Sequence, residues 1–363
     1  PCFRNIPDQL LDSKRRYTQR YLDFIINPNS MNMIHKRHQL LTSLRSFLID
    51  QYQFIEVETP SLWHHSGGAN ATPFQTTESK AFGTHNSLYL RIAPELFLKQ
   101  LIISGYSNIF EIGKVYRNEG IDQTHHPEFT VCELYMAYSN YSTLITFTQD
   151  LLHYLSRTLL NTTIIKINDQ LTIDLSQPFQ QLDVMEQLLI ALKVEKLPNP
   201  NDEKNANLYY QYCLQHDELL HIKKNQTISY YIDKLISKYI EPQCLQPTFL
   251  LNHPRCISPL ARVHDNNPLL TERFELFING IEYINAYTEC NDPLQQVENF
   301  QLHHQDKDQN KEFIEALEHG MPPTAGWGVG IDRLLMLFTQ TTSIRETLSF
   351  PMYRSGISHT LNK

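Results

Sequence analysis

The 363-residue sequence lacks the features that would assign it to a membrane, to the secretory pathway or to a zinc-binding class. Its apolar runs fall short of the roughly 18 residues that a membrane-spanning helix needs, and no charged n-region followed by an apolar h-region opens the chain. The six cysteines are scattered without a C-x-x-C pair, which argues against a zinc site and a disulfide framework. These absences predict an intracellular protein without a membrane span.

An excess of positive charge is also missing. The formal net charge is −8 at pH 7, whereas a protein that is held to nucleic acid by its overall field is basic. Any contact with RNA is therefore expected to use a local patch or a module outside this chain. The sequence contains no G-x-x-x-x-G-K-[ST] phosphate-binding loop, no internal repeat and no low-complexity tract, and its composition is that of an ordinary globular protein.

Hydrophobic periodicity predicts a mixture of helices and strands. Strands tend to come in hairpin pairs rather than in strict alternation with helices, which favours an antiparallel α+β domain. The predicted helices are residues 32–52, 142–160, 183–193, 229–239 and 294–319, with one more after 94 and one after 330. The predicted strands are residues 54–60, 108–120, 127–138 and 324–330, together with a hairpin at 274–289.

The hairpin 274–289, "FELFINGIEYINAYTE", contains three evenly spaced glutamates. The Asn-Gly pair at 279–280 is the strongest short signal for a two-residue type I′ turn. That register pairs Phe277 with Glu282 and places Glu275 on the same face. Two carboxylates on one face repel each other unless a cation lies between them. A solvated edge hairpin with chance acidic residues explains the spacing equally well.

In a regular strand the third glutamate, Glu289, would point to the face opposite to that of Glu282, because the two are an odd number of residues apart. A bulge between Glu282 and Asn285 would bring Asn285, Tyr287 and Glu289 onto the face that carries the other two. The hairpin would then present one acidic wall.

A second cluster lies in "YRNEGIDQTHHPEFTVCELY". Arg117 and Glu119 share a face of the first strand, and Phe129, Glu133 and Tyr135 share a face of the second. The guanidinium could hold a phosphate bidentately, and the Phe129 ring could stack on a base. A structural ladder of ion pairs would explain any one of these residues, but it explains all of them together poorly.

Two glycine-rich stretches are weaker signals. In "GWGVGIDR" the glycines at 326, 328 and 330 alternate, so one strand face lacks side chains and a flat ligand can approach the backbone. Arg333 then falls in the first turn of the following helix, where the helix dipole and the guanidinium both favour an anion. The pair Gly67-Gly68 in "SGGANATPF" taken alone is best explained as an ordinary turn.

Taken together, these stretches closely resemble the three signature motifs of the class II aminoacyl-tRNA synthetases, and the lysyl subgroup matches best. "FIEVETP" resembles motif 1, "VYRNEG…THHPEFTVCELYMAY" motif 2 and "AGWGVGIDRLLMLF" motif 3. "SGGA", "RIAPELFLK", "SPLAR", "TERFELF" and "NAYTECNDP" are also similar to lysyl-enzyme sequence. The matches keep their order over nearly the whole chain.

The resemblance implies the α+β class II catalytic fold, an antiparallel sheet flanked by helices, over residues 31–363, with a helical insertion at 294–319. Residues 1–30 contain "RYTQRYLDFIINP", which resembles the connector from the family's N-terminal OB-fold. The OB-fold itself is absent and the first residue is not methionine, so we expect a fragment or a processed form. We further expect efficient lysine activation but weak tRNA affinity without that anticodon-binding module.

The resemblance also implies an activity, a lysine–tRNA ligase that uses ATP. L-Lysine would be activated to lysyl-adenylate by in-line attack on the α-phosphate, and then transferred to tRNA(Lys). No general base is needed for the first step, so positioning and charge neutralisation carry the catalysis. Arg117 and Arg333 would be the catalytic residues. The ATP-binding residues would be Arg117, Glu119, His125, Phe129, Glu275, Glu282 and Arg333, of which Glu275 and Glu282 would hold Mg²⁺, a hard cation.

The implied lysine site holds each end of the amino acid. Glu95 and the Gly67 carbonyl would bind the α-amino group, and Asn285 with Arg117 the carboxylate. Glu289 and Tyr135 would meet the ε-ammonium, with Glu133 and Tyr287 nearby. A neutral side chain would leave a buried carboxylate unpaired at a cost of several kcal/mol, so we expect neutral isosteres to be rejected.

Two positions depart from the family pattern. Gln53 stands where a glycine is usual, at a helix-to-strand turn that would suit the left-handed conformation, so a modest penalty is expected. Tyr116 replaces a more common phenylalanine. Neither position belongs to the implied site.

Three other interpretations are open. Stand-alone lysyl paralogues that modify a translation elongation factor also lack the OB-fold, although "NAYTECNDP" and the insertion at 294–319 favour a tRNA-charging enzyme. A non-catalytic, RNA-binding relative would have lost the motif arginines and the metal carboxylates. An aspartyl or asparaginyl specificity fits less well, because an aspartate pocket would need an arginine opposite the substrate side chain.

The expected partners follow from the same resemblance. Family members dimerise through the motif 1 helix and strand, so residues 32–60 are the expected homodimer interface, and no membrane is involved. The compartment would be the mitochondrial matrix or the cytoplasm. "LIISG" and "EIGKVYRNEGID" resemble fungal mitochondrial lysyl enzymes and incline the prediction toward mitochondria.

Overall fold

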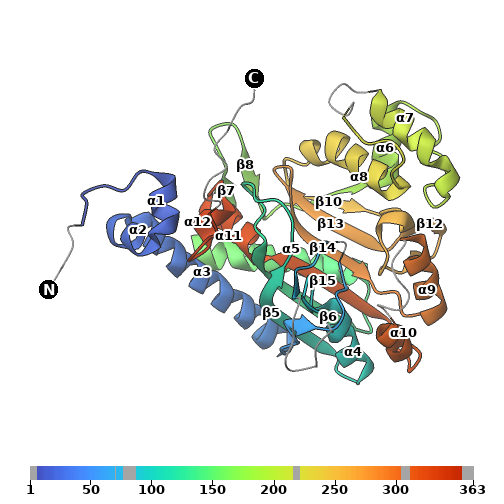
Figure 1. Ribbon diagram of the computed structural model, residues 1–363, viewed down its shortest axis with the longest axis horizontal. Coiled ribbons are helices and arrows are strands. Elements are labelled where there is room, and N and C mark those ends of the chain that lie inside the picture. The colour runs from blue at the N-terminus through green and yellow to red at the C-terminus, as the bar shows by residue number, and fades with distance from the viewer. Residues whose placement is uncertain (1–5, 70, 77–86, 216–220, 304–310, 354–363) are drawn as a thin grey trace.

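The computed structural model describes residues 6–69, 71–76, 87–215, 221–303 and 311–353. An eight-stranded sheet forms its centre (Figure 1). Its neighbours pair antiparallel except at the two ends, where β1 with β5 and β9 with β10 are parallel. In order across the sheet the strands are β1 (Ile55–Glu56), β5 (Asn108–Tyr116), β6 (Glu128–Ala137), β15 (Thr324–Gly330), β14 (Ile281–Thr288), β13 (Arg273–Ile278), β10 (Thr248–Leu251) and β9 (Gln180–Asp183). The predicted α+β class is confirmed.

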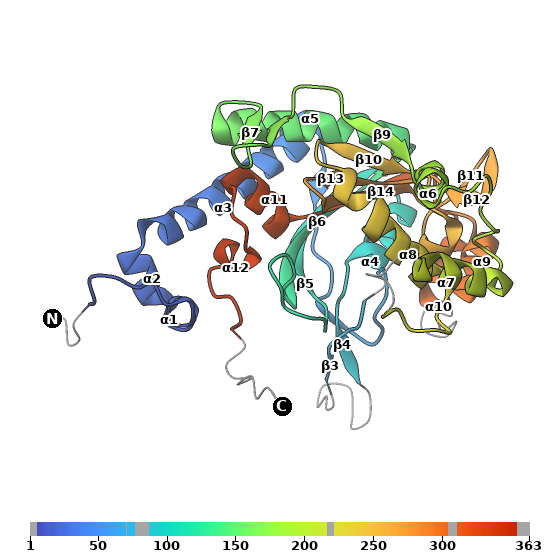
Figure 2. The same ribbon diagram turned by 90° about the horizontal axis from the view of Figure 1, so that it is seen from above.

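Helices cover both faces of this sheet. The long helix α5 (Tyr141–Leu160) lies along one face, as Figure 2 shows, and it packs there with α3 (Pro28–Ser46) and α11 (Ile331–Thr339) over the largest hydrophobic cluster. Trp327 of β15 is buried in that cluster and donates from Nε1 to Thr148 Oγ1 of α5 over 2.9 Å. The opposite face carries α4 (Glu95–Ile103), α9 (Pro293–Leu302) and α10 (Lys311–Leu317) with a cluster of their own.

A further cluster builds a lobe at the β9–β10 end of the sheet. It consists of α6 (Val184–Leu192), α7 (Ala206–Leu214) and α8 (Ile228–Tyr239), which pack against β10 and β13. The predictions at 183–193 and 229–239 correspond to α6 and α8. The sequence analysis did not predict α7, whose segment "ANLYYQYCL" buries only Tyr209 and Cys213 fully and therefore shows little helical periodicity.

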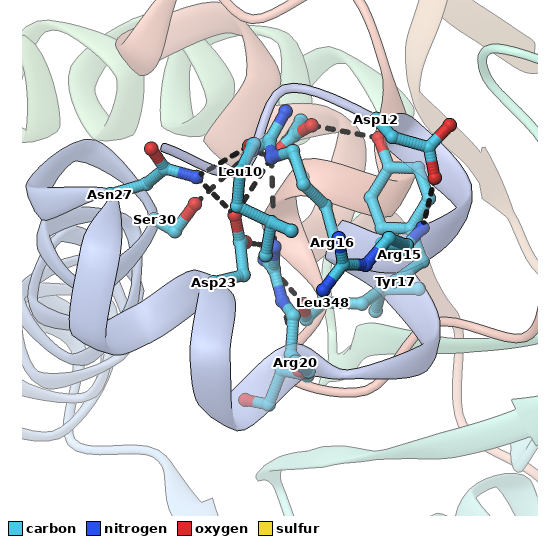
Figure 3. Close-up of polar contacts among 12 residues, drawn as sticks. Leu10, Asp12, Arg15, Arg16, Tyr17, Arg20, Asp23, Asn27, Ser30 and Leu348 are labelled. Carbon is cyan, nitrogen blue, oxygen red and sulfur yellow. Dashed lines mark hydrogen bonds and ion pairs between the residues drawn. The ribbon is translucent and has the colours of Figure 1, made fainter. Parts of the chain in front are cut away.

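The N-terminal helices α1 (Ser13–Thr18) and α2 (Arg20–Ile26) were not predicted, and they dock onto the end of the described chain. Arg16 and Tyr17 bind the Glu346 carboxylate over 3.0 and 2.7 Å, next to α12 (Ile344–Thr347). Asp23 is fully buried and accepts from Arg16 and Arg20 (Figure 3). The described part of the stretch that we predicted as a connector, residues 1–30, is therefore packed against the catalytic domain.

Most other predicted elements are found with shifted ends. The helix predicted at 32–52 is α3 followed by one π-helical turn, Phe47–Gln51. The predicted strand at 54–60 shrinks to the two residues of β1. The insertion at 294–319 contains α9 and α10, and residues 304–310 between them lie outside the described residues.

Short strands complete the fold. A three-stranded sheet contains β2 (Leu62–Trp63), β4 (Leu88–Leu90) and β3 (Gln75–Thr76), and two-stranded ribbons pair β7 (Ile164–Lys166) with β8 (Thr172–Asp174) and β11 (Val263–His264) with β12 (Asn267–Thr271). In the described ranges, no helix has the length and apolarity to cross a membrane.

Candidate active site

The hairpin β13–β14 has the register that the sequence predicts. Asn279 and Gly280 both have positive φ, 52° and 70°, as a type I′ turn requires. Phe277 pairs with Glu282, and the register then shifts so that Glu275 pairs with Asn285. One extra residue, Tyr283, makes up the bulge, so Asn285 and Tyr287 join the face of Glu275.

The exposed face of β6, β15 and β14 forms the floor of a cavity of about 370 Å³. Strands β6 and β14 contribute its polar side chains, and β15 between them contributes the glycines. The motif 2 loop, α4 and the first turn of α11 close its sides. Of the predicted site residues, those lining it are Glu95, Arg117, Glu119, His125, Phe129, Glu133, Tyr135, Glu282, Asn285, Tyr287, Glu289 and Arg333.

The alternating glycines of β15 do leave one strand face bare, as predicted, but the space is used differently. A Cβ at Gly326 would lie 1.9 Å from Glu289 Oε1 and 2.8 Å from Tyr135 Cε1. The protein's own carboxylate therefore occupies the space above Gly326. A Cβ at Gly328 would meet Glu133 Cγ at 3.5 Å and one at Gly330 would meet Arg333 at 3.9 Å, both ordinary contacts, so the floor near these two glycines has room for a ligand against the backbone.

One end of the cavity is rich in arginine. The Arg117 guanidinium carbon lies 5.2 Å from the Phe129 ring centroid, within the range of a cation–π contact. Arg333, in the first turn of α11, donates from Nη1 to the Glu282 backbone oxygen over 2.8 Å and to its Oε2 over 3.3 Å. Two guanidinium groups thus face the cavity beside an aromatic ring, a combination that suits the phosphates and base of a nucleotide.

His125 connects this end to the motif 2 loop. Its Nε2 lies 2.9 Å from Arg333 Nη2, and its Nδ1 lies 2.8 Å from Asp122 Oδ2. Because Arg333 can only donate, Nε2 is assigned as the acceptor and Nδ1–H as the donor to Asp122. Glu119 lies at the cavity margin two residues after Arg117, whose backbone oxygen accepts from the Glu119 N–H.

Glu275 lies on the predicted face but does not line the cavity. Its oxygens lie 2.5 Å from Arg273 Nη2 and 3.2 Å from His253 Nε2. Burial opposes its ionisation, yet the charges of Arg273 and His253 lower the pKa of Glu275 to about 2. Burial and the charge of Glu275 raise the pKa of Glu282.

Glu282 is the member of this pair that is placed to receive a cation from the cavity. Its side chain is 40% exposed, and its one ion-pair partner among the described residues is Arg333. The described residues contain no group of three His, Cys, Asp or Glu that could hold a metal unaided. Two carboxylates together with phosphate oxygens are suitable ligands for Mg²⁺. Glu275 would have to give up its contact with Arg273 or His253 to become one of these ligands. That the pair holds Mg²⁺ stays a prediction.

The other end of the cavity is acidic. Tyr287 donates to both oxygens of Glu95 over 2.8 and 2.9 Å, which fixes that carboxylate at the start of α4. Tyr135 donates to Glu133 over 3.4 Å. Burial and the neighbouring charge of Glu95 raise the pKa of Glu133 to about 8. Glu289 is 1% exposed, and its Oε1, which lies over Gly326, forms no hydrogen bond among the described residues.

Two cations in this region were missed by the sequence analysis. Lys99 is fully buried, with Nζ 2.6 Å from Glu95 and 2.5 Å from Glu289. Arg273 donates to Asn285 Oδ1 over 3.0 Å as well as to Glu275. The spacing of Lys99, four residues after Glu95 on a helix, usually signals an exposed ion pair, and nothing local marks it as buried. Arg273 had a usable signal, since it lies two residues before Glu275 on the same strand face.

One remaining prediction concerns the edge of the site. Gly68 and Ala69 line the cavity, while Gly67, the residue predicted to contact a ligand through its carbonyl, does not. Gly68 has φ +86°, and a Cβ there would lie 3.1 Å from Glu95 Cβ, so it is the glycine that this corner requires.

Comparison with known proteins agrees with this geometry. The family model "tRNA synthetases class II (D, K and N)" matches residues 12–354. The chain is 40% identical to a probable cytoplasmic lysine--tRNA ligase of Encephalitozoon cuniculi, with 97% of this chain and 72% of that protein covered. It is 39% identical to the lysine--tRNA ligase of Bacillus subtilis (97% and 71% covered) and to that of Lactococcus lactis strain MG1363 (96% and 71%).

Proposed function

The chain belongs to the class II tRNA synthetases (D, K and N), and from this premise we propose that it is an ATP-dependent lysine–tRNA ligase, as its relatives are named. The observation that best supports lysine as the substrate is the acidic end of the cavity. A buried carboxylate, Glu289, has no hydrogen bond to either oxygen among the described residues and has an ion-pair partner at Oε2 alone, and a second carboxylate, Glu95, faces the same cavity. An amino acid with two ammonium groups satisfies both, and a neutral or acidic side chain satisfies neither.

In this proposal lysine lies across the floor near Gly328. Its α-ammonium binds Glu95, and its ε-ammonium binds Glu289 Oε1 and the Tyr135 hydroxyl, with Glu133 and Tyr287 close by. Asn285 and Arg117 hold the carboxylate, which points it toward the arginine-rich end. Each polar group of the substrate then has a partner within a cavity of suitable size.

ATP occupies the arginine-rich end. The adenine stacks between Phe129 and the Arg333 guanidinium, with His125 and Glu119 at its edge, and Arg117 binds the α-phosphate. Glu282 and Glu275 would hold Mg²⁺ together with phosphate oxygens, and the ion would supply positive charge for the leaving pyrophosphate.

The first step joins the two substrates. A carboxylate oxygen of lysine attacks the α-phosphorus, and the bond from that phosphorus to the oxygen bridging to the β-phosphate breaks, which yields lysyl-adenylate and pyrophosphate. Arg117 stabilises the charge on the α-phosphate during attack, and Arg333 keeps the nucleotide in line. In the second step a ribose hydroxyl at the end of tRNA(Lys) attacks the carbonyl carbon, and AMP leaves.

Two further features belong to the proposal. The protein acts as a homodimer through residues 32–60, a region that contains exposed Ile49 and Ile55. The compartment is the cytoplasm, as the name of the Encephalitozoon relative suggests, and the inclination toward mitochondria has no support among the relatives.

Amino-acid-dependent exchange of pyrophosphate into ATP tests this function directly. Across the twenty amino acids, only lysine should support exchange, and aminoacylation should be confined to tRNA(Lys). Glu289→Gln should lower kcat/KM for lysine by at least about 100-fold, since a buried partner charge is lost, while Glu315→Gln on the exposed side of α10 should leave it unchanged. Exchange with another amino acid, or near-normal lysine activation by Glu289→Gln, would refute the assignment.

A further inference from the structure

Behind the acidic end of the cavity lies one buried cation. The Lys99 side chain is 0% exposed, and its Nζ lies 2.6 Å from Glu95 Oε1 and 2.5 Å from Glu289 Oε2. These are the two carboxylates to which the proposed function gives the two ends of lysine. One nitrogen therefore connects the substrate's two ammonium sites.

Lys99 approaches the carboxylates from outside the cavity. Glu95, Tyr287 and Glu289 line the cavity, whereas Lys99 does not. Its Nζ lies 5.6 Å from the ring centroid of Phe313, a buried residue of α10, and 5.8 Å from that of Tyr287. A substrate lysine thus does not displace it, because the carboxylates lie between the two.

The oxygens are divided between the cation and the cavity. Lys99 forms an ion pair with Glu289 Oε2. Neither Glu289 oxygen has a hydrogen bond among the described residues, and the cation contact at Oε2 leaves Oε1, over Gly326, for the cavity side. At Glu95 the cation contacts Oε1, and Tyr287 donates to both oxygens. Lys99 therefore contacts both of the carboxylates that line this end of the cavity.

The local charges explain why such a cation is needed. Titratable groups interact with the Glu289 carboxylate from α4, β6, β14 and the segment just after β14, namely Lys99, Glu95, Glu133, Tyr135, Tyr287 and Cys290. Lys99 is the one cation among them. Burial and the neighbouring carboxylates raise the pKa of Glu289, and the Lys99 ammonium opposes that rise. Burial alone would neutralise Lys99, yet Glu289 and Glu95 raise its pKa and keep it charged.

On these grounds we propose that Lys99 is a positioning residue for lysine selection, a permanent counter-ion that neutralises the buried charge of Glu289 and holds Glu289 and Glu95 at a fixed separation before substrate binds. This inference rests on the proposed function. It makes the site selective by pre-organisation, since the substrate need neither remove a proton from Glu289 nor reorient the two carboxylates.

The test uses Lys99→Met in pyrophosphate exchange with the full chain. We expect KM for lysine to rise at least about tenfold, with KM for ATP at the wild-type value, because the arginine-rich end is untouched. The rise should shrink as pH is raised, because Glu289 then ionises without help, relative to the wild type measured in parallel. Lys311→Met, which removes an exposed lysine paired with Glu315 on α10, is the matched control and should change nothing.

A double-mutant cycle separates positioning from stability, and it covers the case in which Lys99→Met folds poorly. Lys99→Met/Glu289→Gln removes one charge of each sign. If Lys99 acts through Glu289, this variant should have the KM for lysine of Glu289→Gln alone. Additive effects, or a lower Tm in Lys99→Met with an unchanged and pH-independent KM, would make Lys99 merely structural and overturn the proposal. If the wild type itself fails to activate lysine, the proposed function fails instead.

Discussion

Single residues decide which amino acid fits the cavity. The strictest steric requirement falls on Gly326, the residue without a side chain. Gly326 has no Cβ, and Glu289 uses that space. Backbone conformation does not demand glycine here, since its φ is not in the left-handed region. The requirement is therefore steric, and it concerns one carboxylate.

Gly326→Ala should consequently abolish lysine activation while leaving ATP binding in place. The new methyl would lie 1.9 Å from Glu289 Oε1 and 2.8 Å from Tyr135 Cε1, so both groups must move. We expect kcat/KM for lysine in pyrophosphate exchange to fall at least about 100-fold, the effect of misplacing a binding group by about 1 Å. Gly328→Ala, whose methyl meets Glu133 Cγ at 3.5 Å, should lose far less. Equal losses for the two would contradict the steric argument.

The protonation state of Glu133 should make lysine binding depend on pH. Burial and Glu95 raise its pKa in the free protein to about 8, and a bound ammonium group favours its ionised form. Below pH 8 binding must therefore expel a proton, so the affinity falls as pH falls, by up to about tenfold per unit. Calorimetric titration with lysine between pH 6 and 8 measures both the affinity and the released proton. Glu133→Gln should flatten the profile, and an affinity that rises toward low pH would contradict this account.

Among helices and strands, the features that the sequence predicted correctly are those determined by residues close together in the chain. The register of β13 and β14 follows from a two-residue turn and from the period of two along each strand, and both are written in consecutive residues. The same holds for the bare glycine face of β15. The contacts of Lys99 with Glu289 and of Arg16 with Glu346 join segments far apart in the chain, and no periodicity encodes them.

In the turn between the π-helical residues Phe47–Gln51 and β1, one residue has the strained backbone conformation that the sequence predicted. Gln53 has φ 58°, the left-handed conformation that glycine adopts without strain. Gln53→Gly should therefore stabilise the protein by about 0.5–1 kcal/mol. Gln51→Gly, two residues earlier in the helical turn, should destabilise it by about 1 kcal/mol. Urea unfolding of both variants measures this, and shifts of the same sign would show that backbone conformation is not the cause.

At the scale of the whole molecule, one edge of the main sheet lies at the surface. Strand β1 is the edge strand at one end of the main sheet, and it pairs only with β5 among the described strands. Large apolar side chains are exposed on this strand and in the segments just before and after it, with Ile55 at 52%, Ile49 at 43% and Leu62 at 42%. An unpaired strand edge next to exposed apolar residues is a surface that proteins usually cover, and a second copy of this chain, seated on residues 32–60, is the cover that we propose.

Ile55→Glu tests this proposal, because it places a charge where the interface would be apolar. A stable dimer buries about 800 Å² per partner, and a buried, unpaired carboxylate there costs several kcal/mol. We expect sedimentation equilibrium to show a dimer for the wild type and a dissociation constant raised at least about 100-fold for Ile55→Glu. Ile190→Glu on α6, a position 68% exposed and far from β1 in sequence, should remain dimeric. If Ile55→Glu also remains dimeric, the interface lies elsewhere, and if the wild type sediments as an active monomer, the cavity needs no second copy to work.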